Sequence, residues 1–162
     1  MRTYWRFMNV TLFAGAGLLA AVAGRACPAQ AEEPGPRFYN SPALAAAKPP
    51  LSQAVRVGDI LYMSGAIGIV PGTPELAPGG IEGETKQAMD NIGAVLKAND
   101  LSFDNVVKCT VMLADMAKWG DFNKVYVTYF KPGRLPARSA FGASGLARNA
   151  QVEVECLAYA GK

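Results

Sequence analysis

The stretch Val152-Glu-Val-Glu-Cys-Leu-Ala-Tyr159 alternates between a uniformly apolar set and a mixed set of side chains. Because successive side chains of a strand point to opposite faces of its sheet, this pattern predicts a strand with one face in a core. A mixed second face often contacts another subunit, so we expect an oligomer. The apolar set is Val152, Val154, Cys156 and Ala158, and the mixed set is Glu153, Glu155, Leu157 and Tyr159.

The preceding part of the chain combines further strand patterns with two helical ones. Apolar residues recur at spacings of three and four in two segments, which predicts helices over 83–98 and 118–130. We expect segments 41–50 and 67–80, rich in Ala, Pro or Gly, to be irregular. The order predicts an α+β fold with both helices on one face of the sheet. Strands are predicted at 37–39, 53–57, 60–64, 106–113, 137–144 and 152–160.

The two predicted helices have distinct apolar faces. The aromatic face of the second is expected to be helix core rather than a stacking surface; it consists of Trp119, Phe122, Tyr126, Tyr129 and Phe130. The apolar stripe of the first is formed by Thr85, Ala88, Ile92, Val95 and Leu96. Its opposite, solvent-facing side is expected to carry Glu84, Lys86, Asp90 and Lys97.

The first 31 residues have the pattern of a secretory signal peptide. Arg2 and Arg6 precede a nearly uncharged apolar run over 7–24, and Ala29-Gln-Ala31 is a small-x-small cleavage pattern. The alternative is an uncleaved anchor, because the run approaches the length that spans a bilayer. Cleavage predicts a periplasmic or secreted protein without membrane contact.

The remaining chain forms one predicted domain. Residues 32–36 are interpreted as a flexible lead-in and residues 37–162 as the domain. The first 31 residues hold three of the 16 basic residues and none of the 13 acidic ones, so the mature chain has a formal net charge of zero. Nucleic-acid binding normally requires a basic face, so we expect no nucleic-acid partner.

Two residue types limit the chemistry. The chain contains no histidine, which excludes Ser-His-Asp and Cys-His catalysis and histidine-ligated metal sites. Cys27, Cys109 and Cys156 lack a short paired spacing, so no metal site is predicted from them. After cleavage, Cys109 and Cys156 remain in apolar strand patterns. Buried free thiols are our preferred interpretation, and a disulfide in an oxidising compartment is the alternative.

Four polar residues are candidates for a site. Arg138, at the start of a predicted strand, could hold a carboxylate by two hydrogen bonds. Glu153 and Glu155 lie about 7 Å apart on one strand face and could transfer protons if that face is enclosed. Because the chain has no histidine, Ser64 has no evident activating base, so we interpret it as a hydrogen-bond donor rather than a nucleophile. For each, the alternative is an ordinary strand or turn residue in solvent.

Several motifs, in the same order, resemble those of the Rid proteins, also called the YjgF type, which are reactive intermediate (enamine/imine) deaminases. The resemblance covers about residues 37–161. It is carried by Leu61-Tyr-Met-Ser-Gly-Ala-Ile-Gly68, Asn105-Val-Val-Lys-Cys-Thr-Val-Met-Leu-Ala-Asp115, Asp121-Phe-Asn-Lys-Val-Tyr126, Leu135-Pro-Ala-Arg-Ser139 and Val152-Glu-Val-Glu155.

This resemblance implies a chorismate-mutase-like fold and a homotrimer with a central β-barrel and sites between subunits. It implies hydrolysis of 2-aminoacrylate or a related enamine or imine acid to a 2-keto acid and ammonia, without cofactor or metal. The residue roles it implies are carboxylate binding by Arg138, positioning or activation of water by Glu153, and substrate contacts by Ser64, the backbone of Ala140 and Asn123.

Two positions depart from the pattern of that family. Leu51, in Pro49-Pro-Leu-Ser-Gln-Ala54, replaces the usual site tyrosine, which implies an altered substrate or weakened activity. Ala140 stands where many members have a cysteine. The alternative function is therefore a trimeric protein that binds small carboxylates without converting them. Ribonuclease activity, also attributed to the family, ranks third because of the neutral mature charge and the absence of histidine.

Overall fold

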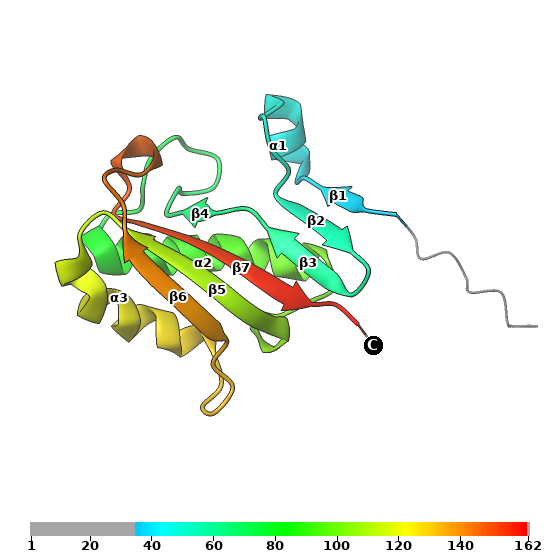
Figure 1. The fold of residues 1–162 in the computed structure, drawn as a ribbon. Coiled ribbons are helices and arrows are strands. Elements are labelled where there is room, and N and C mark those ends of the chain that lie inside the picture. The colour runs from blue at the N-terminus through cyan, green and yellow to red at the C-terminus, as the bar shows by residue number, and fades with distance from the viewer. Residues whose placement is uncertain (1–34, 162) are drawn as a thin grey trace, which may run out of the picture. The chain divides into compact units, whose positions relative to one another are not determined.

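The structure, a computed structural model, describes residues 35–161 of the 162-residue chain (Figure 1). The predicted signal peptide and residues 32–34 of the predicted lead-in lie outside the described residues. Within 35–161, no helix combines the length and apolar character needed to cross a membrane.

The strands form one mixed sheet in the order β1-β2-β3-β7-β5-β6, with β4 paired to β7 next to β3. Every strand pair is antiparallel except β5 with β6. Gly58, at a φ of 54°, makes the turn of the hairpin that joins β2 to β3, which confirms the strands predicted at 53–57 and 60–64. The strands are β1 (Arg37–Tyr39), β2 (Ala54–Val57), β3 (Ile60–Met63), β4 (Ala66–Ile67), β5 (Val106–Leu113), β6 (Ala137–Gly142) and β7 (Val152–Tyr159).

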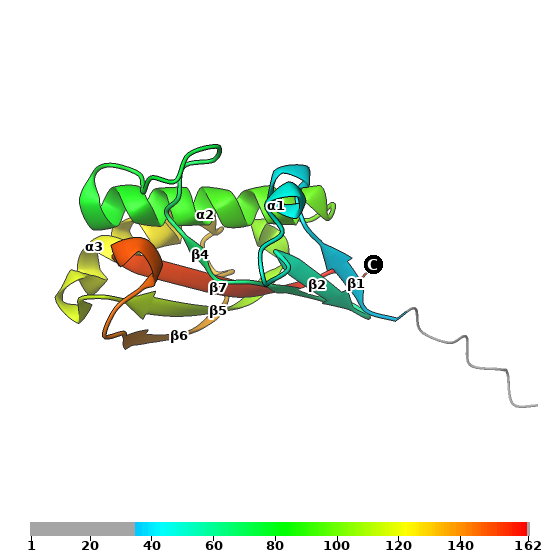
Figure 2. The same cartoon turned by 90° about the horizontal axis from the view of Figure 1, so that it is seen from above.

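Helices α2 (Gly80–Ala98) and α3 (Trp119–Tyr126) cover one face of this sheet, as Figure 2 shows from above. Short 3₁₀ turns precede and follow α3, so the predicted helix over 118–130 is in fact three consecutive pieces. The predicted α+β class, with both long helices on one face, is confirmed. The opposite face, which we call the open face, has no helix on it within the described residues.

The core lies between the two helices and the sheet. All four residues of the predicted apolar set of β7 are buried, namely Val152, Val154, Cys156 and Ala158. Of the mixed set, Glu155 and Tyr159 are exposed. Because β7 lies between β3 and β5, its alternation decides which side of the whole sheet faces the core. Phe122 and Tyr126 are also core residues, as predicted.

Four local expectations were wrong. The segment predicted to be irregular contains α1 (Pro42–Ala47), because the Ser41 side chain accepts a hydrogen bond from the Leu44 N–H at 3.3 Å and caps its first turn. The short strand β4 lies in the predicted loop. Glu84 is only 5% exposed instead of facing solvent. Trp119 is half-buried rather than a core residue.

The pairing of β5 with β7 decides whether the two buried cysteines are free or bonded. Cys109 of β5 and Cys156 of β7 are direct partners in the antiparallel ladder, both are buried, and their sulfur atoms are bonded. Our preferred interpretation of free thiols is therefore wrong. The two residues lie 47 positions apart in sequence, and only the pairing of β5 with β7 brings them together.

Replacing both cysteines, in Cys109→Ala/Cys156→Ala, is expected to lower the free energy of unfolding by about 2–4 kcal/mol, because the bond restricts the unfolded chain over 47 residues. Urea unfolding measures this change. Wild type under reducing conditions should approach the stability of the double variant. In protein that lacks residues 1–31 and therefore Cys27, two titratable thiols in the denatured, unreduced state would contradict the expected bond.

Candidate functional site

Arg138 lies on β6, at one edge of the sheet, and points to the side that carries the helices. Its ladder partner is Cys109, which is buried on that side. The guanidinium Nη1 donates a hydrogen bond to the Asn123 Oδ1 of α3 at 2.8 Å. Two residues predicted to share a site, Arg138 and Asn123, are thus in direct contact.

Three aromatic rings of α3 lie against the same guanidinium. Trp119, Phe122 and Tyr126 are spaced by three and four residues, which places them on one face of the helix. The Cζ of Arg138 is 4.4 Å from the centre of the Trp119 ring, 4.7 Å from that of Tyr126 and 5.7 Å from that of Phe122. We call these three residues the aromatic row. Their ring faces attract the positive charge while leaving N–H donors free for another partner.

The hydroxyl of Tyr126 is buried beside Arg138 and, within residues 35–161, has no hydrogen-bond partner. Burial raises the pKa of this phenol to about 12, although the nearby charge of Arg138 lowers it. Tyr126 therefore stays neutral at physiological pH and contributes its ring rather than a base.

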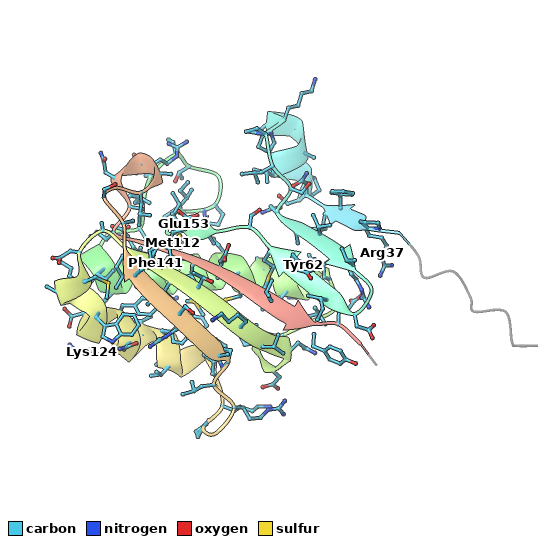
Figure 3. The ribbon with its side chains drawn as sticks, viewed as in Figure 1. Arg37, Tyr62, Met112, Lys124, Phe141 and Glu153 are labelled. Carbon is cyan, nitrogen blue, oxygen red and sulfur yellow. A yellow bond between two sulfur atoms is a disulfide. The ribbon has the colours of Figure 1, made fainter. Side chains whose placement is uncertain are left out.

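Glu153 points to the open face. Its ladder partners are Met112 of β5, labelled beside it in Figure 3, and Ile67 of β4. The side chains of Met112 and Ile67 are half-buried. The carboxylate lies against the backbone of Gly65, where a Cβ would overlap the Glu153 Oε1. Glycine at position 65 is thus needed for this placement of the carboxylate.

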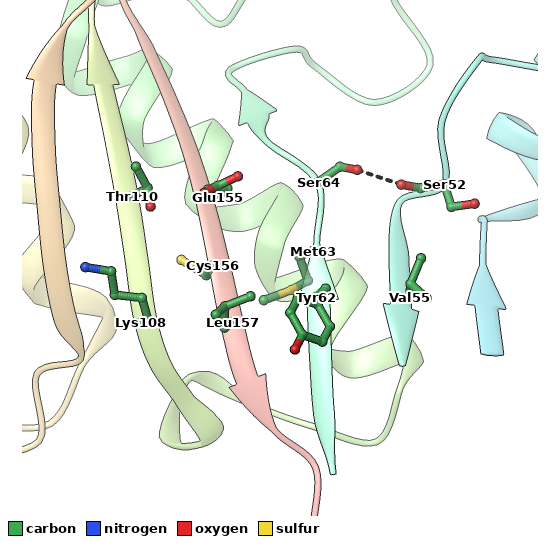
Figure 4. Close-up of a pocket in the computed structure, with 10 residues that line it drawn as sticks. All are labelled: Ser52, Val55, Tyr62, Met63, Ser64, Lys108, Thr110, Glu155, Cys156 and Leu157. Carbon is green, nitrogen blue, oxygen red and sulfur yellow. Dashed lines mark hydrogen bonds between the residues drawn. The ribbon is translucent and has the colours of Figure 1, made fainter. Parts of the chain in front are cut away.

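Ser64 and Glu155 line a pocket of about 490 Å³ on the open face (Figure 4). The Ser64 hydroxyl donates its proton to the backbone carbonyl of Ser52 at 2.6 Å. Its oxygen is left as an acceptor, so the expected donor role would require this bond to break. Lys108, also in the pocket lining, donates to the Ser139 Oγ at 2.7 Å.

Glu84 is a buried carboxylate that the sequence pattern assigned to solvent. Its two oxygens accept hydrogen bonds from Gln151, one from the backbone N–H at 2.8 Å and one from the side-chain amide at 2.9 Å. Gln151 directly precedes β7, so this contact fixes the start of the strand that carries Glu153. No spacing in the sequence indicated the pair, because its members lie 67 residues apart.

A single copy of the chain divides the predicted site residues into two groups. Arg138 and Asn123 lie on the helix side of the sheet, and Ala140 lies beside them on the edge strand β6. Ser64 and Glu153 lie around the open face. A small molecule bound within one copy cannot touch both Arg138 and Glu153, because the sheet separates them. In the described part, no three His, Cys, Asp or Glu side chains are grouped so as to hold a metal ion.

The sequence is similar to those of known proteins. The family model described as endoribonuclease L-PSP matches residues 41–160. The mouse protein named 2-iminobutanoate/2-iminopropanoate deaminase is 48% identical over 112 residues, which are 69% of this chain and 82% of the mouse protein. The human protein of the same name is 43% identical over 112 residues, 69% and 81% of the two chains.

Solved structures agree with the fold. The crystal structure of RidA from the Antarctic bacterium Psychrobacter sp. superposes with a TM-score of 0.65 at 35% identity and covers 69% of this chain and 89% of its own. The structure of E. coli TdcF, which contains bound serine, gives a TM-score of 0.65 at 27% identity and covers 70% and 90%.

Gly65→Ala is expected to displace the Glu153 carboxylate without unfolding the protein, because the overlapping atom is at the end of a flexible side chain. We expect a stability loss below about 1 kcal/mol and at least an approximately tenfold loss of any activity that depends on Glu153. A crystal structure of the variant and thermal unfolding test the two parts. Gly120→Ala is the matched control, since a Cβ there meets nothing within 4 Å. An unmoved Glu153 in Gly65→Ala would contradict the prediction.

Proposed function

This chain belongs to the endoribonuclease L-PSP family, and we propose that it hydrolyses enamine or imine acids of the 2-aminoacrylate/2-iminopropanoate type to 2-keto acids and ammonia. Relatives that are 43–48% identical and are named as deaminases of such imino acids support the proposal. The observation that carries it is Arg138, a cation held by Asn123 and three rings with donors left for a substrate carboxylate.

The proposed reaction needs modest assistance, because the imine carbon is already electrophilic. Arg138 would bind the carboxylate and orient the C=N bond. Glu153 would take a proton from a water molecule while the oxygen of that water bonds to the imine carbon, and a proton would pass to the imine nitrogen. Collapse of the resulting carbinolamine breaks the C–N bond, releases ammonia and leaves the keto acid. In this scheme no cofactor or metal takes part.

The separation of Arg138 and Glu153 by the sheet leads us to propose that each site is shared by two copies in a homotrimer. The open face supports this assembly, because it exposes large apolar side chains: Tyr62 is 48% and Phe141 51% exposed in a single copy (Figure 3). The free edge of β6, the strand that carries Ala140, has no partner strand among the described residues, so backbone groups along this edge are available to a neighbour or a substrate. The resemblance to Rid proteins implies the trimer with a central β-barrel.

We further propose that the protein works in the periplasm or outside the cell. The pattern of residues 1–31 supports export. The bond between Cys109 and Cys156 also supports it, since disulfides persist mainly in oxidising compartments. A reaction that produces 2-imino acids, such as oxidation or elimination of amino acids, would then have to supply the substrate in that compartment.

Leu51 favours a second candidate function. It is 51% exposed and precedes Ser52, which lines the pocket on the open face, and it offers no hydroxyl to a ligand. A protein that binds keto acids or similar carboxylates without converting them would keep Arg138 and could dispense with the site tyrosine. Cleavage of RNA ranks third, because the chain without residues 1–31 has a formal net charge of zero and contains no histidine.

The first test is hydrolysis of imino acids generated in situ by an amino-acid oxidase. We expect the protein to accelerate release of keto acid, and Arg138→Ala to lower kcat/KM by at least about 30-fold, because two charge-assisted hydrogen bonds are lost. Arg134→Ala, an exposed arginine just before β6, is the matched control and should retain full activity. Saturable binding of 2-ketobutyrate without any acceleration would instead favour the binding protein.

Mixed trimers test the shared site. Arg138→Ala and Glu153→Gln should each be nearly inactive alone. After denaturation and refolding of an equal mixture, about a quarter of the sites should combine an intact Arg138 with an intact Glu153 of the neighbour, since each is present with a chance of one half. Activity should recover to about that fraction of wild type. No recovery in a mixture that forms trimers would mean that both residues act within one copy.

A further inference from the structure

The charge of Arg138 is compensated in an unusual way. Within residues 35–161, the ion pairs join other residues, and no Asp or Glu forms a salt bridge with this half-buried guanidinium. Its neighbours are a neutral amide oxygen and three neutral rings. A carboxylate partner would compete with a ligand carboxylate for the same N–H donors, whereas ring faces do not use those donors.

The members of the aromatic row differ in burial. Phe122 and Tyr126 are 0% and 2% exposed and belong to the core, while Trp119 is half-buried at the start of α3. Trp119 also makes the shortest of the three contacts with the guanidinium. Its ring stacks on that of Phe122, with centroids 6.0 Å apart and planes inclined by 29°, so its orientation is fixed by the core beneath it.

We propose that Trp119 is a positioning residue for the carboxylate site: its ring, aligned by Phe122, holds the Arg138 guanidinium in one orientation before a ligand arrives. A long side chain that is already ordered loses less conformational entropy on binding. The proposal rests on the proposed function only for the identity of the ligand, a small 2-keto or 2-imino carboxylate. The ordering of the guanidinium itself does not depend on any reaction.

Binding of the carboxylate and activation of water depend on residues that lie on opposite faces of the sheet. Trp119 contacts Arg138 and lies on the helix side, whereas the proposed water-activating residue, Glu153, is on the other face of the sheet. Loss of the Trp119 ring should therefore weaken binding of the carboxylate and raise KM, while kcat changes little. A merely structural role in the core would lower stability without this split between KM and kcat.

Three variants in the full protein test the proposal with 2-ketobutyrate as the probe. Trp119→Leu removes the ring and should raise the Kd, measured by calorimetry, about 3- to 10-fold. Trp119→Phe keeps a ring and should stay within about twofold of wild type. Phe103→Leu is the matched control, because Phe103 packs on Tyr129 and Phe130, whereas the rings against Arg138 are those of the aromatic row. It should lower stability and leave the Kd unchanged.

The order of the Arg138 guanidinium can be measured without ligand, independently of any activity. Nuclear magnetic resonance of the Arg138 Nε–H group should give a sharp signal that is shifted by the ring current of Trp119, and the shift should be lost in Trp119→Leu. An averaged, unshifted Arg138 signal in wild type, or an unchanged Kd in Trp119→Leu, would overturn the positioning role while leaving the deaminase proposal intact. An ordered Arg138 in a protein that neither binds nor converts these acids would overturn the proposed function alone.

Discussion

The alternation of side chains across β6, β5 and β7 is the constraint on which the rest of the structure depends. Every register position in these three strands commits a residue to the helix side or to the open face. Arg138 aligns with Cys109 and is committed to the helix side, and Glu153 aligns with Met112 and is committed to the open face. A shift of one residue in the pairing of β5 with β7 would turn Glu153 to the helix side and bury its carboxylate in the core, and a shift in the pairing of β5 with β6 would move Arg138 away from the aromatic row.

The two faces have different physical tasks. The helix side is closed by α2 and α3 and holds an arginine among rings, which lets a cation remain half-buried at low cost. The open face carries carboxylates and exposed aromatic side chains, and Ser64, Glu155 and Tyr62 line a pocket there. In the proposed homotrimer, burying the apolar residues of this face against a neighbour would supply both stability and a second wall for the proposed site.

Patterns of period two and period three to four were sufficient to predict the sheet, the two long helices and the layer that they form. They could not predict the contact of Trp119 with Arg138, which joins a helix to a strand and depends on how α3 packs. They also missed α1, which depends on one capping side chain, and the buried Glu84, whose hydrogen-bond partner Gln151 is remote in sequence. Apolar patterning placed both cysteines inside but could not tell a bond from two thiols, because that requires the register of β5 on β7.

The sulfur bridge also has a topological consequence. The segment between Cys109 and Cys156 contains α3 and β6, so Trp119, Asn123 and Arg138 all belong to one covalent ring. This ring is closed at Cys109, the ladder partner of Arg138. Sub-global opening that detaches α3 and β6 from the sheet must therefore occur with both ends of the segment still tethered, which limits the entropy that such opening gains. The hydrogen-bonded amide protons of α3, and those that join β6 to β5, should accordingly exchange more slowly with the bridge intact than after its reduction.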